Sequence, residues 1–272
     1  MNPFERLQDF PALGYGISAV LGLIIGSFLN VVIARLPEGR SVVRPGSSCP
    51  KCGSGIAWHD NIPVLSWALL RGRCRGCGNP ISPRYPLVEL LTALVFVAVF
   101  HRQGPGIHLL VRGWPLVAIL IAVTFIDLDH RIIPDELSLG GLVLGLATCW
   151  LDPERSWLEC VGGAAMGYGL FFGLAWVYLQ ATGRSGLGGG DIKLLAMLGA
   201  FMGPVGVFAT ILVSSLSGSL IGIAWGLWLR SRGRRKKRMM RLAIPYGPFL
   251  VIGALYYYLF DGGSWLRFMT PT

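Results

Sequence analysis

Apolar stretches recur from residue 15 to residue 260, and short polar stretches separate them. A lipid bilayer offers no water to backbone polar groups, so a chain with this pattern is expected to cross it as α-helices. The predicted fold class is an all-α polytopic membrane protein. Its apolar runs predict about eight transmembrane helices, near residues 15–35, 86–101, 114–126, 137–151, 160–180, 192–203, 205–229 and 243–260.

The apolar stretch over residues 192–229 is too long for one ordinary transmembrane helix. Gly203 and Pro204 lie inside it, and proline cannot continue a helix interior because it lacks a backbone N–H and clashes with the preceding turn. We therefore predict two helices that meet at Gly203–Pro204.

Composition supports the membrane class. Hydrophobic residues make up 53% of the 272-residue chain and charged residues only 14%, whereas a soluble domain is about a quarter charged. The first residues carry Glu5, Asp9 and a single Arg6. They do not form the basic start of a cleavable signal peptide, so we expect the first span to stay in the protein.

The basic residues predict the topology. With the N-terminus outside and eight spans, most of the 24 lysines and arginines fall on the cytoplasmic side, as the positive-inside rule requires. Both Asp127 and Asp191 then lie at the cytoplasmic face. The basic run over residues 230–241 joins two spans, so we interpret it as a contact with anionic membrane lipids rather than a nucleic-acid site.

Four cysteines in the first cytoplasmic loop form two closely spaced pairs, separated by 21 residues. This pattern is typical of a zinc site with four thiolate ligands. Four thiolates close the coordination shell, so the predicted Zn²⁺ is structural. The alternative is two disulfides, which a reducing cytoplasm disfavours. The predicted ligands are Cys49, Cys52, Cys74 and Cys77.

The other two cysteines, Cys149 and Cys160, lie in or near apolar spans, and we expect them to be small buried side chains. The sequence thus divides into three predicted parts. Residues 1–36 form an N-terminal span, residues 37–85 a small zinc-binding cytoplasmic loop domain, and residues 86–272 the transmembrane core.

Asp127 and Asp191 each lie at the edge of an apolar segment. An ionisable residue in such a place is energetically costly and marks a candidate functional site. Two carboxyl groups that meet there suggest acid–base chemistry on a water molecule, as in an aspartyl protease. The alternatives are helix caps, or proton relays in a transporter. We find no internal repeat or midplane site typical of a transporter.

Taken together, the motifs resemble the type IV prepilin leader peptidases, which are also N-methyltransferases. The resemblance covers nearly the whole chain. It rests on the order and spacing of Gly26-Ser27-Phe28-Leu29-Asn30, Arg35-Leu36-Pro37, the cysteine pairs, Asn61-Ile62-Pro63, Ser82-Pro83-Arg84-Tyr85-Pro86, Asp127 with Ile133-Pro134-Asp135, and Gly188-Gly189-Gly190-Asp191-Ile192-Lys193.

The resemblance implies a bifunctional enzyme in the bacterial inner membrane. Its substrates would be prepilin and pseudopilin precursors, cut after a glycine at the cytoplasmic face. The new α-amino group would then be methylated with S-adenosylmethionine, in a reaction linked to residues 37–85. By position, Asp127 and Asp191 match the catalytic pair. A second hypothesis keeps the peptidase alone, with the zinc loop as a scaffold.

Neighbouring residues suggest how the pair works. Asp191 opens a helix, where the helix dipole favours negative charge, so we expect it to be the base and Asp127 the acid. Lys193 would strengthen that bias. Gly188 and Gly190 carry no side chain and would let a substrate backbone approach.

Glu89 is a lone acid entering an apolar helix, where burial is costly without a partner. It would hold the substrate ammonium or the sulfonium of the methyl donor, or pair with Arg84 or Asn30. The chain has no glycine-rich dinucleotide fingerprint, so the methyl donor must use another surface. The resemblance favours the cysteine-bearing loop and its flanking helices as the place where the methyl donor binds.

Overall fold

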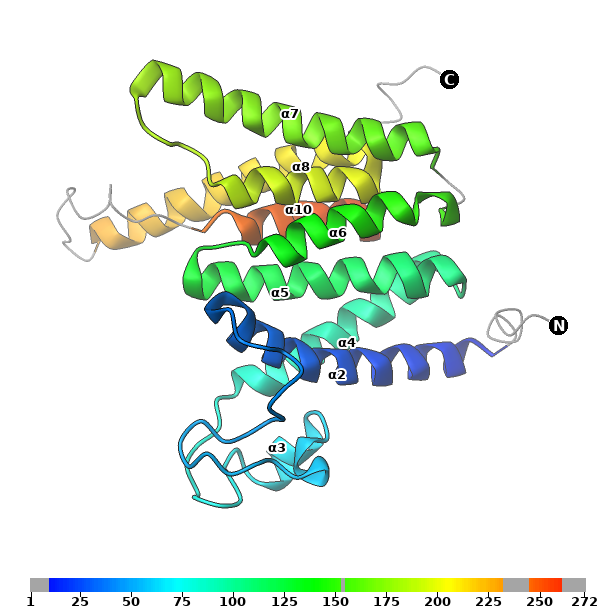
Figure 1. Ribbon diagram of the computed structural model, residues 1–272, viewed down its shortest axis with the longest axis vertical. Helices are drawn as coiled ribbons and strands as arrows, with labels where there is room; N and C mark the ends of the chain where they lie inside the picture. Colours follow the sequence, from blue (N-terminus) through cyan, green and yellow to red (C-terminus); the bar gives the residue numbers. More distant parts are fainter. Residues whose placement is uncertain (1–9, 153–154, 232–244, 261–272) are drawn as a thin grey trace. The chain divides into compact units, whose positions relative to one another are not determined.

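The computed structural model describes residues 10–152, 155–231 and 245–260, and its regular structure there is almost entirely helical (Figure 1). The chain divides into two compact units, Met1–Ala122 and Val123–Thr272. The principal helices are α2 (Pro11–Arg35), α3 (Leu65–Leu69), α4 (Arg84–Gln103), α5 (Trp114–His130), α6 (Asp135–Ala147), α7 (Trp157–Thr182), α8 (Gly189–Ser231) and α10 (Gly247–Phe260).

The predicted all-α membrane class is confirmed, but the count of eight spans is not. Five helical segments among the described residues are long and apolar enough to cross a membrane: Pro11–Glu38, Arg84–Gln103, Leu109–His130, Trp157–Thr182 and Gly189–Trp228. Helix α10 is apolar but only 14 residues long, and α6 has 13. Each is shorter than the roughly 20 residues of an untilted crossing.

In the first unit, α2 packs against α4 through glycines. A Cβ atom on Gly22 would lie 2.5 Å from Cα of Ala93, and one on Gly26 would lie 2.6 Å from Cα of Glu89. Only residues without a side chain let two helix backbones approach so closely in lipid. Gly26 therefore brings the polar end of α2 next to Glu89.

In the second unit, α8 is the central helix and packs against α6, α7 and α10 (Figure 1). Its first half is the most buried part of the unit, with Leu194, Leu195, Met197 and Leu198 fully enclosed. A helix that is apolar on all sides is expected at the centre of a membrane bundle. The start of this helix carries Asp191, so the best-packed element of the unit positions that residue.

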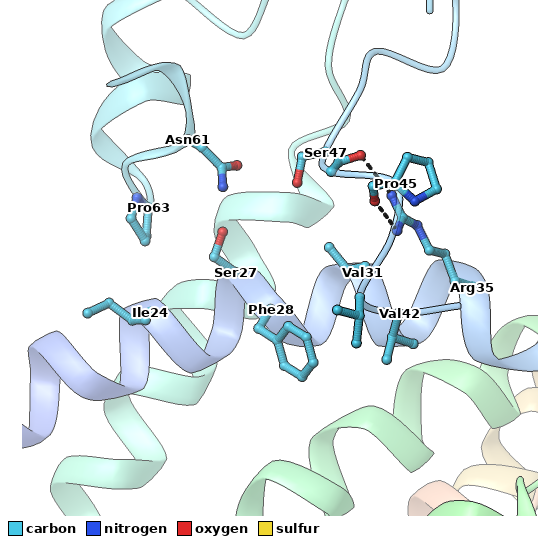
Figure 2. A pocket seen from close by; sticks show the side chains of 12 residues that line it. Ile24, Ser27, Phe28, Val31, Arg35, Val42, Pro45, Ser47, Asn61 and Pro63 are labelled. Atoms are coloured by element: carbon cyan, nitrogen blue, oxygen red, sulfur yellow. Dashed lines mark hydrogen bonds between the residues drawn. The ribbon is translucent and has the colours of Figure 1, made fainter. Parts of the chain in front are cut away.

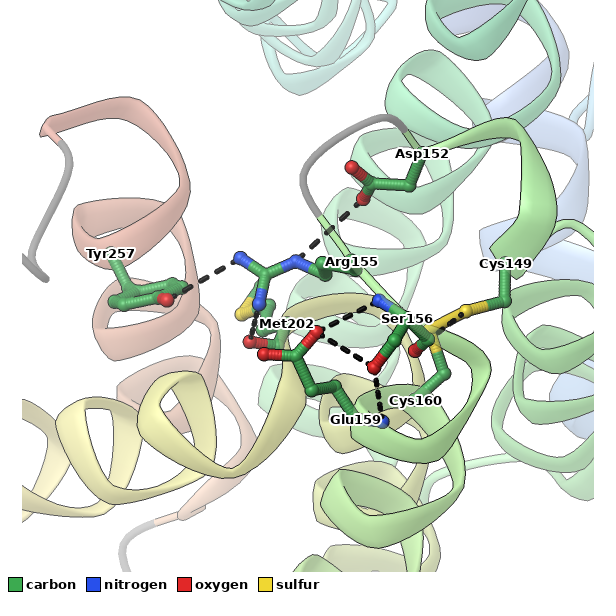
Figure 3. A network of polar contacts seen from close by, with 8 residues as sticks. All are labelled: Cys149, Asp152, Arg155, Ser156, Glu159, Cys160, Met202 and Tyr257. Atoms are coloured by element: carbon green, nitrogen blue, oxygen red, sulfur yellow. Dashed lines mark hydrogen bonds and ion pairs between the residues drawn. A yellow bond between two sulfur atoms is a disulfide. The ribbon is translucent and has the colours of Figure 1, made fainter.

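The predicted break at Gly203–Pro204 is found. Gly203 has non-helical angles, with φ of 70°, and two helices meet there within α8. The guanidinium of Arg155 donates a hydrogen bond to the carbonyl of Met202, the residue before Gly203 (Figure 3). Arg155 also donates to the Tyr257 hydroxyl at 3.3 Å and lies 3.6 Å from the carboxylate of Asp152. One side chain thus connects α8, α10 and the segment before α7.

The interpretation of Cys149 and Cys160 as independent small side chains is wrong. Both are buried, but they form a disulfide, with their Cα atoms 6.4 Å apart. The chain turns between the end of α6 and the start of α7, and this turn brings residues separated by 11 positions together. The bond closes the connection that contains Arg155 (Figure 3).

Most of the basic run over residues 230–241 lies outside the described residues. Its assignment to lipid contact, and the exclusion of nucleic acid, therefore stay predictions. The same holds for the division at residues 36 and 85.

The crossing of α7 and α8 depends on Gly163. A Cβ atom there would lie 2.3 Å from the carbonyl oxygen of Gly199, whereas one on Gly169 of the same helix meets nothing within 4 Å. Gly163→Ala should destabilise the protein by about 1–3 kcal/mol, the usual cost of overpacking. Unfolding in detergent micelles measures this change, with Gly169→Ala as the matched control. Equal unfolding midpoints for the two variants would contradict this prediction, because they would show that α7 and α8 can move apart to accept the added methyl group without loss of stability.

Candidate active site and metal centre

Asp127 lies in the last turn of α5 and is 6% exposed. The backbone N–H of Gly247 donates to its Oδ2 atom at 2.9 Å. Gly247 is the first residue of α10, where the backbone N–H groups have no partner within the helix. A carboxylate at a helix start is stabilised by that N–H and by the helix dipole. The structure therefore gives the buried Asp127 a specific anion-binding partner.

Asp191 lies in the first turn of α8, and its carboxyl group accepts a hydrogen bond from the backbone of Gly188. Its own N–H donates to the carbonyl of Gly188 at 3.1 Å. The carboxyl groups of Asp127 and Asp191 lie within electrostatic range of each other. The two acids are therefore neighbours in one unit, and each carboxyl group is held at a helix start.

Lys193 forms an ion pair with Asp135. Its Nζ atom contacts both carboxylate oxygens of Asp135, at 2.7 and 2.8 Å. Asp135 begins α6, so this ion pair connects the starts of α6 and α8 beside the two acids. The expected role of Lys193 in substrate binding or in biasing Asp191 stays a prediction.

The glycine run before α8 has two kinds of member. Gly188 is exposed, with Oδ2 of Asp191 3.0 Å from where its Cβ would lie. At Gly190, a Cβ atom would lie 2.9 Å from Cβ of Ile133. Packing within the chain therefore explains the glycine at position 190, because it lets the loop that carries Ile133 approach α8. A direct approach of substrate to Gly188 or Gly190 stays a prediction.

In the first unit, the four paired cysteines converge. Their Sγ atoms all lie within 4.8 Å of one another, and those of Cys49 and Cys77 are 3.9 Å apart. A zinc ion with four thiolates about 2.3 Å away requires sulfur–sulfur separations of about 3.8 Å. All four are free cysteines in the structure, so the alternative of two disulfides is wrong there.

The two cysteine pairs are built in the same way. The N–H of Gly53 donates to the carbonyl of Cys49, and that of Gly78 to the carbonyl of Cys74, both at 2.9 Å. Both glycines have positive φ angles of about 70°, as the tight turns require. Hydrogen bonds from Ser54 lower the pKa of Cys52 to about 6. Cys52 is therefore mostly thiolate at neutral pH, which is the form that binds a metal.

Glu89 is buried, with 7% of its surface exposed, and its carboxylate accepts the N–H of Val64 at 2.7 Å and a bond from Ser27. Val64 has a φ of 60°, which is rare for a β-branched residue. Asn30 donates to the carbonyl of Tyr85 instead. The expected pairing with Asn30 is therefore not found, and Glu89 instead holds the loop that precedes α3.

A pocket of about 310 Å³ lies beside this carboxylate, between α2 and the cysteine-bearing loop. Figure 2 shows Ser27 and Asn61 at one end, Arg35 at the other, and apolar side chains between them. The guanidinium of Arg35 donates to the carbonyls of Ser41, Pro45 and Gly46. No carboxylate is among these partners.

Sequence reasoning missed Gly247, the group that binds Asp127. Gly247 is followed by Pro248 just before the last apolar run, and that pattern is typical of a helix start. Nothing in the sequence alone links this helix start to an aspartate 120 residues earlier. It also missed the Asp135–Lys193 pair and the Cys149–Cys160 disulfide.

Comparison with known proteins identifies the family of this chain. Residues 20–103 match the family model of the bacterial peptidase A24 N-terminal domain, and residues 114–223 match the type IV leader peptidase family. Together the two matches cover most of the chain. No solved structure matches.

Three relatives are named prepilin leader peptidase/N-methyltransferase. One from Xanthomonas campestris is 39% identical, with 90% of this chain and 91% of the relative covered. One from Aeromonas hydrophila is 42% identical, with 91% of each covered. One from Myxococcus xanthus is 46% identical over 80% of this chain, but the match spans only 64% of that relative. Because a relative above 30% identity is covered almost completely, this chain belongs to the type IV leader peptidase family.

Proposed function

We propose that the second unit is an aspartyl peptidase that removes the leader from prepilin and pseudopilin precursors. The relatives carry this activity in their names, and the match to the type IV leader peptidase family covers residues 114–223, which include both acids. The single observation that carries the proposal is the approach of the Asp127 and Asp191 carboxyl groups. The cut would follow the leader's glycine, as the family resemblance implies.

The two acids divide the chemistry. Like charges close together cannot both ionise easily, so one carboxyl group keeps a proton while the other stays charged. The charged carboxylate takes a proton from water as the water attacks the scissile carbonyl carbon. The protonated acid donates to the carbonyl oxygen or the leaving amine. Each acid accepts one backbone N–H at a helix start, so helix position alone does not decide which is the base.

Asp127→Asn and Asp191→Asn should each abolish detectable cleavage, since loss of a positioned acid or base costs roughly 10²–10⁴-fold in rate. The assay uses purified protein and a synthetic precursor with an intact leader. Asp129→Asn is the control, because this exposed acid lies two residues from Asp127. Normal cleavage by either active-site variant would remove that residue from the catalytic role.

Gly247→Ala should slow cleavage roughly ten- to hundredfold, the kinetic equivalent of a displacement that costs about 1–3 kcal/mol. A Cβ atom at this position would lie 2.7 Å from Oδ2 of Asp127, so the carboxylate has to move. Gly222→Ala serves as the control, because a Cβ atom there meets nothing within 4 Å. Unchanged kcat in Gly247→Ala would show that Asp127 needs no fixed position.

The first unit is proposed to methylate the new N-terminus. S-adenosylmethionine, when bound, supplies an electrophilic methyl group. The residues that fit its chemistry are Glu89, a buried carboxylate beside a pocket, and Arg35, a guanidinium whose hydrogen bonds within the described residues all go to carbonyl groups. A carboxylate favours a neighbouring cation, such as a sulfonium or an α-ammonium group. Glu89 would then serve methyl transfer and have no part in cleavage.

We also propose that Cys49, Cys52, Cys74 and Cys77 hold one structural Zn²⁺. Their sulfur separations fit a tetrahedral thiolate site. Such a site leaves no open coordination position, so the metal would act by folding residues 37–85. The loop contributes Pro45, Ser47, Asn61 and Pro63 to the pocket wall, so loss of zinc would change the pocket.

Purified protein should contain about one zinc per chain, and Cys49→Ser should lower that content because three thiolates bind more weakly than four. Elemental analysis measures the metal. Methylation of an already cleaved peptide should fall with the zinc, while cleavage by the second unit should be largely retained. Wild-type protein that is active in methylation and free of zinc would contradict the assignment.

The cysteines also support the proposed topology. Disulfides persist in oxidising compartments, while free thiols are typical of the reducing cytoplasm. The Cys149–Cys160 bond falls in a connection that the positive-inside arrangement puts outside, and the four free cysteines fall in a loop that it puts inside. We therefore propose eight crossings in the bacterial inner membrane, with both acids at the cytoplasmic face.

A further inference from the structure

We propose that the pocket between α2 and the cysteine-bearing loop is the binding site for S-adenosylmethionine, oriented by Glu89 at one end and Arg35 at the other. This inference rests on the proposed methyl transfer and adds the location and orientation of its methyl donor. The pocket lies entirely within the first unit.

Size and lining are the first argument. Small-molecule sites usually measure about 300–1,000 Å³, are mostly apolar and carry a few convergent polar groups. This pocket measures about 310 Å³. Its apolar wall includes Phe28, Val31 and Val42, while Ser27 and Asn61 supply polar atoms at one end (Figure 2). An adenine ring suits such a wall, because aromatic and aliphatic side chains bury its faces.

Charge is the second argument. The carboxylate of Glu89 bonds to Ser27, which lines the pocket, and to the N–H of Val64, next to the lining residue Pro63. The acidic side chain of Glu89 therefore lies one contact away from the lining at that end. Arg35 lines the pocket, and its hydrogen bonds within the described residues go to the carbonyls of Ser41, Pro45 and Gly46, which do not neutralise its charge. The pocket thus has an acidic side chain near one end and a guanidinium at the other, which suits a ligand that carries both a cation and an anion.

S-adenosylmethionine matches both ends, because it carries a sulfonium centre and, a few bonds away, an amino-acid carboxylate. Placed with its sulfonium toward Ser27 and Glu89, it directs its carboxylate toward Arg35. Burying a carboxylate in an apolar unit costs free energy. Electrostatic attraction to the sulfonium would explain why an acid occupies position 89. The unusual backbone of Val64 belongs to the same end, and strained residues of this kind cluster at functional sites.

Direct binding tests the location. Calorimetry on the zinc-loaded, full-length protein in detergent measures the Kd for S-adenosylmethionine. Val31→Trp fills the pocket from α2 and should weaken binding at least tenfold, while leader cleavage stays normal. Val20→Trp is the matched control, because Val20 lies on the same helix, is 55% exposed and does not line the pocket. Val42→Trp, on the cysteine-bearing loop rather than on α2, repeats the test with an independent substitution.

A second ligand tests the orientation. S-adenosylhomocysteine lacks the sulfonium charge, so wild-type protein should bind it more weakly than S-adenosylmethionine. Glu89→Gln should abolish that preference. The same variant should lose methylation but cleave the leader at the normal rate. Arg35→Lys keeps the positive charge and should retain most of the affinity for both ligands. An unchanged preference in Glu89→Gln would overturn the proposed orientation.

The outcomes distinguish failure of the methyltransferase function from failure of the proposed binding pocket. Wild-type protein that neither binds S-adenosylmethionine nor methylates cleaved peptide would refute the proposed methyltransferase function itself. Wild-type protein that binds and methylates, with Val31→Trp and Val42→Trp binding equally well, would refute this pocket alone. Normal donor binding with lost methylation in the tryptophan variants would assign the pocket to the peptide end instead, which also overturns the proposal.

Discussion

The hydrogen bond from the N–H of Gly247 to the buried carboxylate of Asp127 is the interaction on which the second unit depends. A carboxylate in an apolar environment needs a donor, and a helix start supplies unpaired N–H groups. The chain uses this device twice, since Asp191 receives the N–H of Gly188 at the start of α8. Two helix starts thereby hold two acids that would otherwise repel each other.

Packing keeps these helix starts in place. The centre of α8 is fully buried, and glycine contacts let α7 lie directly against it. At the break at Gly203, Arg155 bonds to α8 and α10, and the Cys149–Cys160 disulfide closes the segment that carries Arg155. The Asp135–Lys193 pair connects α6 to α8 beside the acids. The Asp135–Lys193 pair thus fixes the bundle near the acids, and Arg155 and the disulfide fix it near the break in α8.

Local patterns predicted the helices, the break at Gly203–Pro204 and the four-cysteine cluster, because each depends on residues close in sequence or on a distinctive spacing. Long-range pairings were not predictable in the same way. Gly247 with Asp127, Lys193 with Asp135, and Glu89 with Val64 all depend on how helices pack, which periodicity does not encode. The disulfide was missed because apolar surroundings suggested ordinary buried cysteines.

Cross-linking tests the central claim most directly, that the side chains at positions 127 and 191 face each other. The double variant Asp127→Cys/Asp191→Cys, treated in membranes with a short bifunctional thiol reagent, should become linked between α5 and α8. Proteolysis between the two positions would then leave one joined fragment. The single variants control for reaction with native cysteines. Absence of the link in the double variant, with both thiols shown to be reactive, would contradict the account.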